Sequence, residues 1–208
     1  MVTFAPLTGE VLDETSLQNI QARADAPRNF RNILFTNKFD QMLLISLSSA
    51  SGCLHVLDGS QVETAGLEDK LTLQAASYSL ISQVMPERDP PQMPQFFGQE
   101  PVHNWCYDYQ RASLARQQHN WSEVARLGDK ALAAGYAPQD MSEWLPFIEG
   151  YWNIGRDKDA LYLSNLIRAD ESAWKAICSN LSASHTPSGG YSDESIFQRM
   201  LVGLCNPE

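Results

Sequence analysis

Tandem helical hairpins between residues 105 and 168 constrain the fold of this chain more than any other stretch of its sequence. Apolar and aromatic residues recur there at the three- and four-residue spacing of an amphipathic helix, and short polar turns interrupt them. The spacing predicts four helices, at about 103–118, 121–135, 140–154 and 157–169. Because one hairpin cannot bury its apolar stripe alone, we expect the two hairpins to stack on each other.

Six residues of the second hairpin fall at key positions of the 34-residue tetratricopeptide pattern. They are Trp144, Phe147, Ile148, Tyr151, Gly155 and Ala160. In the first hairpin, Ala112 takes a position that requires a small residue, which lets neighbouring helices approach closely. These residues resemble a tetratricopeptide-like repeat, and the resemblance implies a helical array with a concave binding face. The alternative is a pair of ordinary helical hairpins without superhelical stacking.

The N-terminal part of the chain carries strand-like segments followed by one helix. Polar turns separate three short apolar segments, at residues 32–36, 41–48 and 53–57. Their length is typical of β-strands, so they predict a small three-stranded sheet, in part antiparallel. Helical spacing over residues 67–85 predicts one helix, which Pro86 ends. Residues 1–27 predict an extended lead-in with a short helix at 16–23.

Five prolines between residues 86 and 102 separate these two parts of the chain. Proline argues against a helix there, so we interpret the segment as a linker. Beyond the hairpins, apolar spacing predicts two further helices, at 171–181 and 194–205. The predicted class is α+β: a small three-stranded sheet with one helix, followed by a tetratricopeptide-like α-helical array. Its predicted parts are a small α/β N-terminal region at 1–85, a proline-rich linker at 86–102 and a tetratricopeptide-like helical domain at 103–208.

A formal net charge of −10 with scattered Lys and Arg residues argues against the basic surface that nucleic acids and anionic membranes require. The sequence has no glycine-rich phosphate loop, and its cysteines and histidines lack the spacing of zinc ligands, so we expect no cofactor and no metal. No apolar segment reaches the ~18 residues of a membrane helix, and the N-terminus lacks signal-peptide features. We expect this chain to be soluble and untargeted, either alone or as a piece of a longer protein.

Several segments together resemble the soluble C-terminal region of certain bacterial multi-spanning membrane proteins. They are residues 39–47, 52–58, 100–107, 121–131, 135–138 and 142–151. Those proteins are described as dolichyl-phosphate-mannose-protein mannosyltransferase-like, or as uncharacterised membrane proteins. The family's catalytic carboxylate belongs to its membrane half, so the resemblance assigns no catalytic residue to this chain. It implies an extracytoplasmic accessory domain that binds a protein or glycan-bearing partner and meets the membrane only through a membrane-spanning region missing from this sequence.

The four cysteines are Cys53, Cys106, Cys178 and Cys205. In an oxidising compartment, our preferred disulfide joins Cys53 to Cys106. Cys53 begins a predicted strand and Cys106 begins the first hairpin helix, so this bridge would clamp the two parts of the chain. The alternative is that the cysteines are free, buried thiols that pack as small apolar residues.

Four residues are candidates for a binding surface on the array. Tyr109, Arg116 and Trp152 are candidates for the concave face, where such arrays bind peptides or glycans through aromatic and charged side chains. The alternative for each of the three is a place in the repeat core. His103, close to Trp105, is a candidate for lining a groove, and its alternative is a capping or loop role.

Three functions remain open at this point. The first is a non-catalytic scaffold, the accessory domain that the resemblance implies. The second is a stand-alone cytosolic adaptor that binds a protein partner. The third is an enzyme that uses a cleft between sheet and helices, with His55 or His103 and an aspartate. The absence of any paired acid–base or nucleophile motif favours binding over catalysis. An enzyme would need a deep polar pocket between the two parts.

Overall fold

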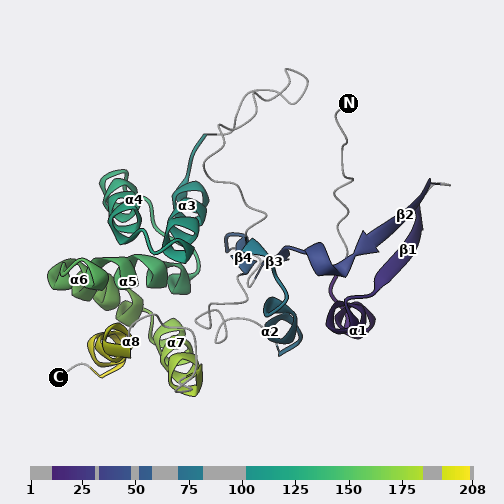
Figure 1. The fold of residues 1–208 in the computed structure, drawn as a ribbon. Helices are drawn as coiled ribbons and strands as arrows, with labels where there is room; N and C mark the ends of the chain where they lie inside the picture. Colours follow the sequence, from purple (N-terminus) through teal and green to yellow (C-terminus); the bar gives the residue numbers. More distant parts are fainter. Residues whose placement is uncertain are drawn as a thin grey trace.

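The computed structural model describes residues 11–30, 33–47, 52–57, 70–81, 102–184 and 194–206. This part of the chain is α+β and mostly helical, as the sequence predicts (Figure 1). The helices between residues 105 and 200 gather in one body, the elements between residues 44 and 76 lie next to it, and the helix and strands of residues 14–38 lie farther away. Of the predicted proline-rich linker, only Val102 belongs to the described residues, so the predicted domain boundary at 86–102 lies outside them.

The N-terminal elements are, in order, α1 (Glu14–Ala22), β1 (Asp25–Phe30), β2 (Ile33–Lys38), the 3-10 turn η1 (Phe39–Gln41), β3 (Leu44–Ser46), β4 (His55–Leu57) and α2 (Lys70–Ala76). Helix α1 begins after Asp13, whose side chain accepts a hydrogen bond from Ser16 N at 2.7 Å. It ends at Arg23, which takes a left-handed backbone conformation with φ of 48°. Leu17 and Ile20 form its buried face.

The strands pair as two antiparallel hairpins, β1 with β2 and β3 with β4. Strands β2, β3 and β4 overlap the three segments expected from the sequence, and β1 comes in addition. Strand β1 was not predicted, because it contains Pro27, and proline has no backbone N–H to donate to a neighbouring strand. The residue is tolerated there because a two-stranded sheet leaves one edge of each strand without a hydrogen-bonded neighbour.

Helix α2 ends at Ala76, earlier than the helix expected at 67–85, and the chain then turns back to β3 and β4. Residues 67–69 and 82–85 of that expected helix lie outside the described residues. Ser79 makes this connection: its hydroxyl donates to Leu57 O at 2.5 Å and accepts from Leu44 N at 3.0 Å. A small apolar core lies between α1, α2 and the strands. Its buried members are Leu17, Ile20, Ala26, Phe39, Leu44, Leu57, Ala75 and Ala76.

The helical elements are α3 (Trp105–Gln117), α4 (Trp121–Ala133), the 3-10 turn η5 (Met141–Trp144), α5 (Leu145–Asn153), α6 (Asp157–Ala169), α7 (Glu171–Ser184), α8 (Glu194–Met200) and the π-helical turn η6 (Leu201–Cys205). From α3 to α7, each helix packs on the next along the chain. Positive φ angles at His119, Gly135 and Gly155 end three of these helices. The four helices predicted between 103 and 169 are therefore confirmed to within a few residues, whereas their tetratricopeptide character stays a prediction.

Close approach of α4 and α5 sets the packing of the helical body. A Cβ atom on Gly150 would lie 2.6 Å from Cγ1 of Val124, and one on Gly128 would lie 2.8 Å from the hydroxyl of Tyr151. Glycine is therefore required at both positions for this contact. Around it, Trp144, Phe147 and Tyr151 are among the largest fully buried side chains.

Candidate binding site

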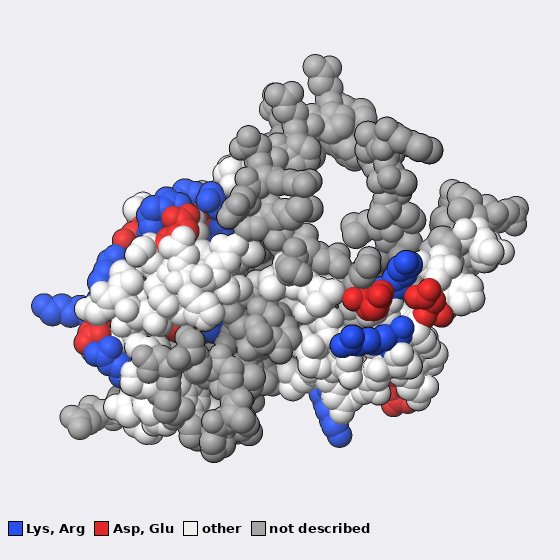
Figure 2. Space-filling view, in the orientation of Figure 1, with Lys and Arg blue, Asp and Glu red and all other residues white. Residues whose placement is uncertain are grey.

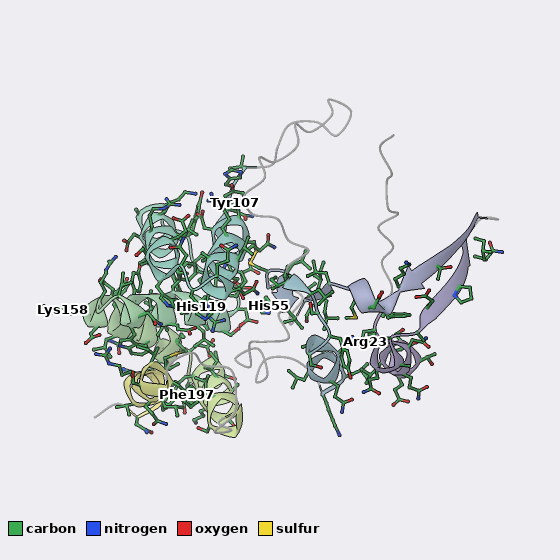
Figure 3. The ribbon with its side chains drawn as sticks, in the orientation of Figure 1. Arg23, His55, Tyr107, His119, Lys158 and Phe197 are labelled. Atoms are coloured by element: carbon green, nitrogen blue, oxygen red, sulfur yellow. A yellow bond between two sulfur atoms is a disulfide. The ribbon has the colours of Figure 1, made fainter. Side chains whose placement is uncertain are left out.

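The β3–β4 hairpin is held against α3 near both ends of that helix. Cys53, just before β4, forms a disulfide with Cys106 in the first turn of α3, with the two Cα atoms 5.3 Å apart. At the other end of α3, the side-chain amide of Gln117 donates to Val56 O at 3.0 Å. His55 lies between these contacts, facing the helical body (Figure 3), and its ring centroid is 5.4 Å from that of Tyr109.

Glu143 joins the same two parts from inside the helical body. Its carboxylate accepts a hydrogen bond from Cys53 N at 2.5 Å and another from Trp105 Nε1 at 2.5 Å, and its side chain is buried. Burial raises the pKa of Glu143, because a desolvated carboxylate loses the stabilisation that water gives its charge. The two hydrogen bonds act against this shift. Glu143 thus fixes the position of β4 relative to α3.

A cavity of about 340 Å³ lies between the β3–β4 hairpin and α3. Its lining residues are Ile45, Leu54, Val56, Ile81, Tyr107, Gln110, Arg111, Ser113, Leu114 and Gln117. The N-terminal part supplies apolar side chains only, and α3 supplies one mixed face of apolar and polar side chains. A volume of this size is at the lower end of the range of small-molecule sites.

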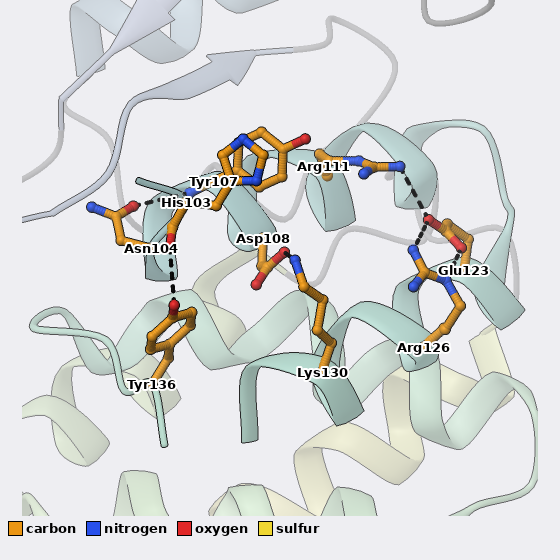
Figure 4. Close-up of polar contacts among 9 residues, drawn as sticks. All are labelled: His103, Asn104, Tyr107, Asp108, Arg111, Glu123, Arg126, Lys130 and Tyr136. Carbon is orange, nitrogen blue, oxygen red and sulfur yellow. Dashed lines mark hydrogen bonds and ion pairs between the residues drawn. The ribbon is translucent and has the colours of Figure 1, made fainter. Parts of the chain in front are cut away.

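A cluster of aromatic and charged side chains flanks this cavity on α3 and α4 (Figure 4). The ring of His103 stacks on Tyr107 with centroids 3.5 Å apart. Lys130 Nζ lies 5.6 Å from the centre of the Tyr107 ring, and the guanidinium of Arg111 lies 5.8 Å from it. Both distances are those of cation–π contacts, so the Tyr107 ring attracts the cationic groups of Lys130 and Arg111 beside the cavity.

Ion pairs neutralise part of the charge in this cluster. Lys130 Nζ lies 2.6 Å from the buried carboxylate of Asp108. Arg126 donates to both carboxylate oxygens of Glu123 at 2.6 Å each, and these hydrogen bonds hold the pKa of Glu123 below its ordinary value. Arg111 lies farther from Glu123, at 3.5 Å. Three cations therefore share two carboxylates.

Three of the four predicted binding residues are buried, which corrects the expectation that they line an open concave face. Tyr109 is 6% exposed, Arg116 is 7% exposed and Trp152 is 4% exposed. Arg116 forms a buried ion pair with Glu149. Trp152 packs where a Cβ atom on Gly203 would lie, and Tyr109 packs beside Trp105. The structure gives these residues packing roles, because the helices around them close over each side chain.

His103 alone among the four lies beside the cavity, through its contact with Tyr107. Its backbone carbonyl also accepts a hydrogen bond from the hydroxyl of Tyr136 at 3.0 Å. The cavity itself is not predicted from the sequence. Its helical side follows the three- and four-residue spacing of one α3 face, from Tyr107 through Arg111 to Leu114. This face mixes polar and apolar residues, so no apolar stripe marks it.

A second disulfide joins Cys178 in α7 to Cys205 in η6, with Cα atoms 5.6 Å apart. Nearby, Trp174 Nε1 donates to Leu204 O at 2.9 Å and Arg168 donates to Leu204 O at 3.1 Å. These bonds fix the π-helical turn against α6 and α7. The sequence predicts the pairing of Cys53 with Cys106, whereas this second pairing was not predicted from it.

Comparisons of the chain with protein-family models, with curated proteins and with solved structures find no match. Within the described ranges, no helix has the length and apolar character needed to cross a membrane. The same residues contain no group of three or more His, Cys, Asp or Glu side chains placed to hold a metal ion. The resemblance to mannosyltransferase-like membrane proteins therefore stays a prediction from the sequence.

Proposed function

We propose that this chain is a non-catalytic binding domain that holds an apolar group of its ligand in the cavity between β3–β4 and α3. The cavity is the observation that carries this proposal. Most of its lining side chains are apolar or uncharged, with Arg111 as the charged exception. Sites of this kind obtain affinity from removing apolar surface from water, and their few polar groups orient the ligand.

The walls of the cavity are held in place without a ligand. The Cys53–Cys106 disulfide and the Gln117–Val56 hydrogen bond tie the β3–β4 hairpin to α3 at two separated points. A site that is ordered in advance spends less free energy on ordering when the ligand binds. This arrangement supports binding as the role of the junction.

The cavity also narrows the choice of partner. The sequence predicts a protein or a glycan-bearing partner. An apolar wall formed by Ile45, Leu54 and Val56 would leave sugar hydroxyls without the hydrogen bonds that they make in water. The same lining also suits acid–base catalysis poorly, since an enzyme at this junction would need a polar pocket. We therefore propose that the group bound in the cavity is apolar.

A neutral fluorescent probe tests the binding function. We expect N-phenyl-1-naphthylamine to bind the full chain at one saturable site, with fluorescence enhancement in a titration. Ser113 lines the cavity, so Ser113→Trp should fill it and abolish the signal. Ser122 is exposed on α4 and is not among the lining residues, so Ser122→Trp is the matched control and should bind like wild type. Equal binding by both variants, or no saturable binding by the wild type, would contradict the proposal.

For the setting, we propose an extracytoplasmic accessory domain of a membrane glycosyltransferase-like protein. Pairing of all four cysteines supports the compartment, because disulfides persist mainly in oxidising environments. The link to a glycosyltransferase rests on the sequence resemblance alone. Intact mass of protein from its native host, with thiols blocked at lysis, should show no alkylated cysteine. Four alkylated cysteines would contradict this setting and favour the cytosolic adaptor.

A further inference from the structure

We propose that the ligand of the cavity is a single-chain anionic amphiphile, with its alkyl or acyl tail between β3–β4 and α3 and its anionic head on Arg111. This inference rests on the proposed binding function and adds the chemical class of the ligand. It follows from two observations on the described residues. One is the charge balance at the edge of the cavity, and the other is the apolar surface that extends from it.

Charge balance singles out Arg111 among the three cations of the cluster. Lys130 is 2.6 Å from Asp108, and Arg126 holds both oxygens of Glu123 at 2.6 Å. Arg111 approaches the same Glu123 only to 3.5 Å, so it competes for a carboxylate that is already neutralised. The excess positive charge of the cluster therefore lies on Arg111.

Arg111 also has the position that an anion-binding group needs. Its side chain is 50% exposed and is at the same time one of the residues that line the cavity. A planar guanidinium can donate two parallel hydrogen bonds to a carboxylate or a phosphate oxygen pair. An anionic group at this edge would thus meet a cation, while any apolar chain attached to it would point into an apolar space.

The apolar surface continues beyond the cavity along the hairpin. Ile45, Leu47 and Leu54 are about half exposed, at 52%, 55% and 49%, and Leu80, next to Ile81 of the lining, is 38% exposed. Exposed apolar side chains gathered in this way mark interaction surfaces. A tail longer than the cavity would therefore remain on apolar side chains.

A simple amphiphile fits this site better than an acidic peptide. A peptide would bring backbone N–H and C=O groups into a space whose hairpin wall is apolar, and each unpaired group costs free energy.

The negative net charge of the whole chain makes a local excess of positive charge necessary for anion binding. At −10 the molecule repels anions in general, so anion binding depends on a local excess of positive charge such as the one at Arg111. In Figure 2, charged side chains lie mainly at the margin of the helical body, and uncharged side chains cover much of the face in view.

Three probes with the same ten-carbon tail test the inference on the full chain. Decanoate, decanol and decylamine are titrated as competitors of bound N-phenyl-1-naphthylamine. We expect decanoate to displace the dye at a concentration about tenfold lower than decanol, as one charge-assisted hydrogen-bonded contact allows. Decylamine should be the weakest competitor, because Arg111 repels it.

Two variants locate the effect on the charge cluster. Arg111→Gln should bring decanoate to the affinity of decanol and leave decanol unchanged, whereas Arg199→Gln, at an exposed arginine of α8, should leave both unchanged. Glu123→Gln removes the carboxylate that competes for Arg111, so it should strengthen decanoate binding. Glu171→Gln, an exposed glutamate of α7, controls for the change in net charge and should have little effect.

The outcomes separate this inference from the function on which it rests. Equal affinity for decanoate and decanol in the wild type would overturn the anionic head while leaving an apolar binding site in place. An unchanged preference for decanoate in Arg111→Gln would also overturn it. Failure of every probe, the dye included, to bind saturably would overturn both the inference and the proposed binding function.

Discussion

Glu143 and Glu149 are carboxylates inside the helical body, and each is held by donors from another part of the chain. Glu143 accepts from Cys53 N and Trp105 Nε1, and Glu149 pairs with Arg116 of α3. Both residues are buried: Glu143 is 1% exposed and Glu149 is 4% exposed. A buried charge is tolerated only when its partners replace the water that it has lost. Stability should therefore depend on both members of each contact.

Removing the Glu143 carboxylate should leave two buried donors without an acceptor. We expect Glu143→Ala to lower the free energy of unfolding by about 3 kcal/mol, since each unsatisfied buried group costs about 1–3 kcal/mol. Urea denaturation followed by circular dichroism measures the change. Glu171→Ala, at an exposed position on α7, should cost less than 1 kcal/mol. Similar losses for the two variants would mean that Glu143 does not bear these bonds.

Glu143 should also give the stability a distinct pH dependence. Because its pKa is raised in the folded state, the folded protein keeps this proton at pH values where the unfolded chain has lost it. The contribution of Glu143 to the free energy of unfolding therefore falls as pH rises from the ordinary carboxyl pKa through the raised one. Glu143→Gln lacks this titration, so the free energy of unfolding of the wild type minus that of Glu143→Gln should decrease over that interval. An increase in this difference would show that the pKa is lowered instead.

The Arg116–Glu149 pair should show strong coupling. Arg116→Met alone and Glu149→Leu alone each break the buried ion pair, and we expect each to cost about 3–5 kcal/mol. The double variant removes both charges and should lose clearly less than the sum of the two single losses. A double-mutant cycle from urea titrations gives the coupling. Additive losses would indicate that Arg116 acts through packing and not through the ion pair.

At the scale of the elements, the α4–α5 contact decides how tightly the helical body closes. Gly150 faces Val124 and Gly128 faces Tyr151, so the two helices approach where side chains are absent. Tyr151 then donates a hydrogen bond to Asp129 of α4 at 2.8 Å. Arg156, after α5, binds Asp129 at 2.7 Å and lies over the Tyr151 ring. These polar contacts fix the rotation of α5 against α4.

Gly150→Ala tests this contact through the sign of its effect. In most helix interiors, replacing glycine by alanine raises stability by about 0.5–1 kcal/mol. Here the new methyl group would collide with Val124, so we expect a loss of about 1–3 kcal/mol. Thermal and urea denaturation measure it. Ser179→Ala, at an exposed position on α7, should be neutral or slightly stabilising. A stabilising Gly150→Ala would show that α4 and α5 lie farther apart.

At the scale of the whole molecule, the two disulfides act on different parts of the structure. Cys53–Cys106 closes a separation of 53 residues and joins the N-terminal strands to α3, whereas Cys178–Cys205 closes 27 residues within the C-terminal helices. Of the two bridges, the first joins the β3–β4 hairpin to α3, the elements between which the cavity lies. Cys53 also belongs to the core of the helical body, although it lies in the N-terminal part of the sequence.

Paired alanine variants should separate these roles. We expect Cys53→Ala/Cys106→Ala and Cys178→Ala/Cys205→Ala each to lower the free energy of unfolding by about 2–4 kcal/mol, since each bridge restricts the unfolded chain. Affinity for the neutral dye should fall in the first variant only, because it releases the β3–β4 wall. Both properties are measured on the same preparations. Equal loss of affinity for the dye in both variants would show that the binding site does not depend specifically on the Cys53–Cys106 bridge.

Local sequence patterns were enough to predict the α+β class and the positions of the main helices, because these depend on neighbours within a few residues. Apolar spacing located α3 to α6, Asn120 caps α4 by accepting from Glu123 N at 3.2 Å, and Gly135 and Gly155 take the positive φ angles that end helices. Tertiary structure alone decided which side chains are buried and which meet. Arg116 lies in the core because Glu149, 33 residues away, neutralises it. The cavity needs the β3–β4 hairpin against α3, and that junction depends on Cys53 and Glu143, 90 residues apart. Local periodicity carries no record of partners so distant.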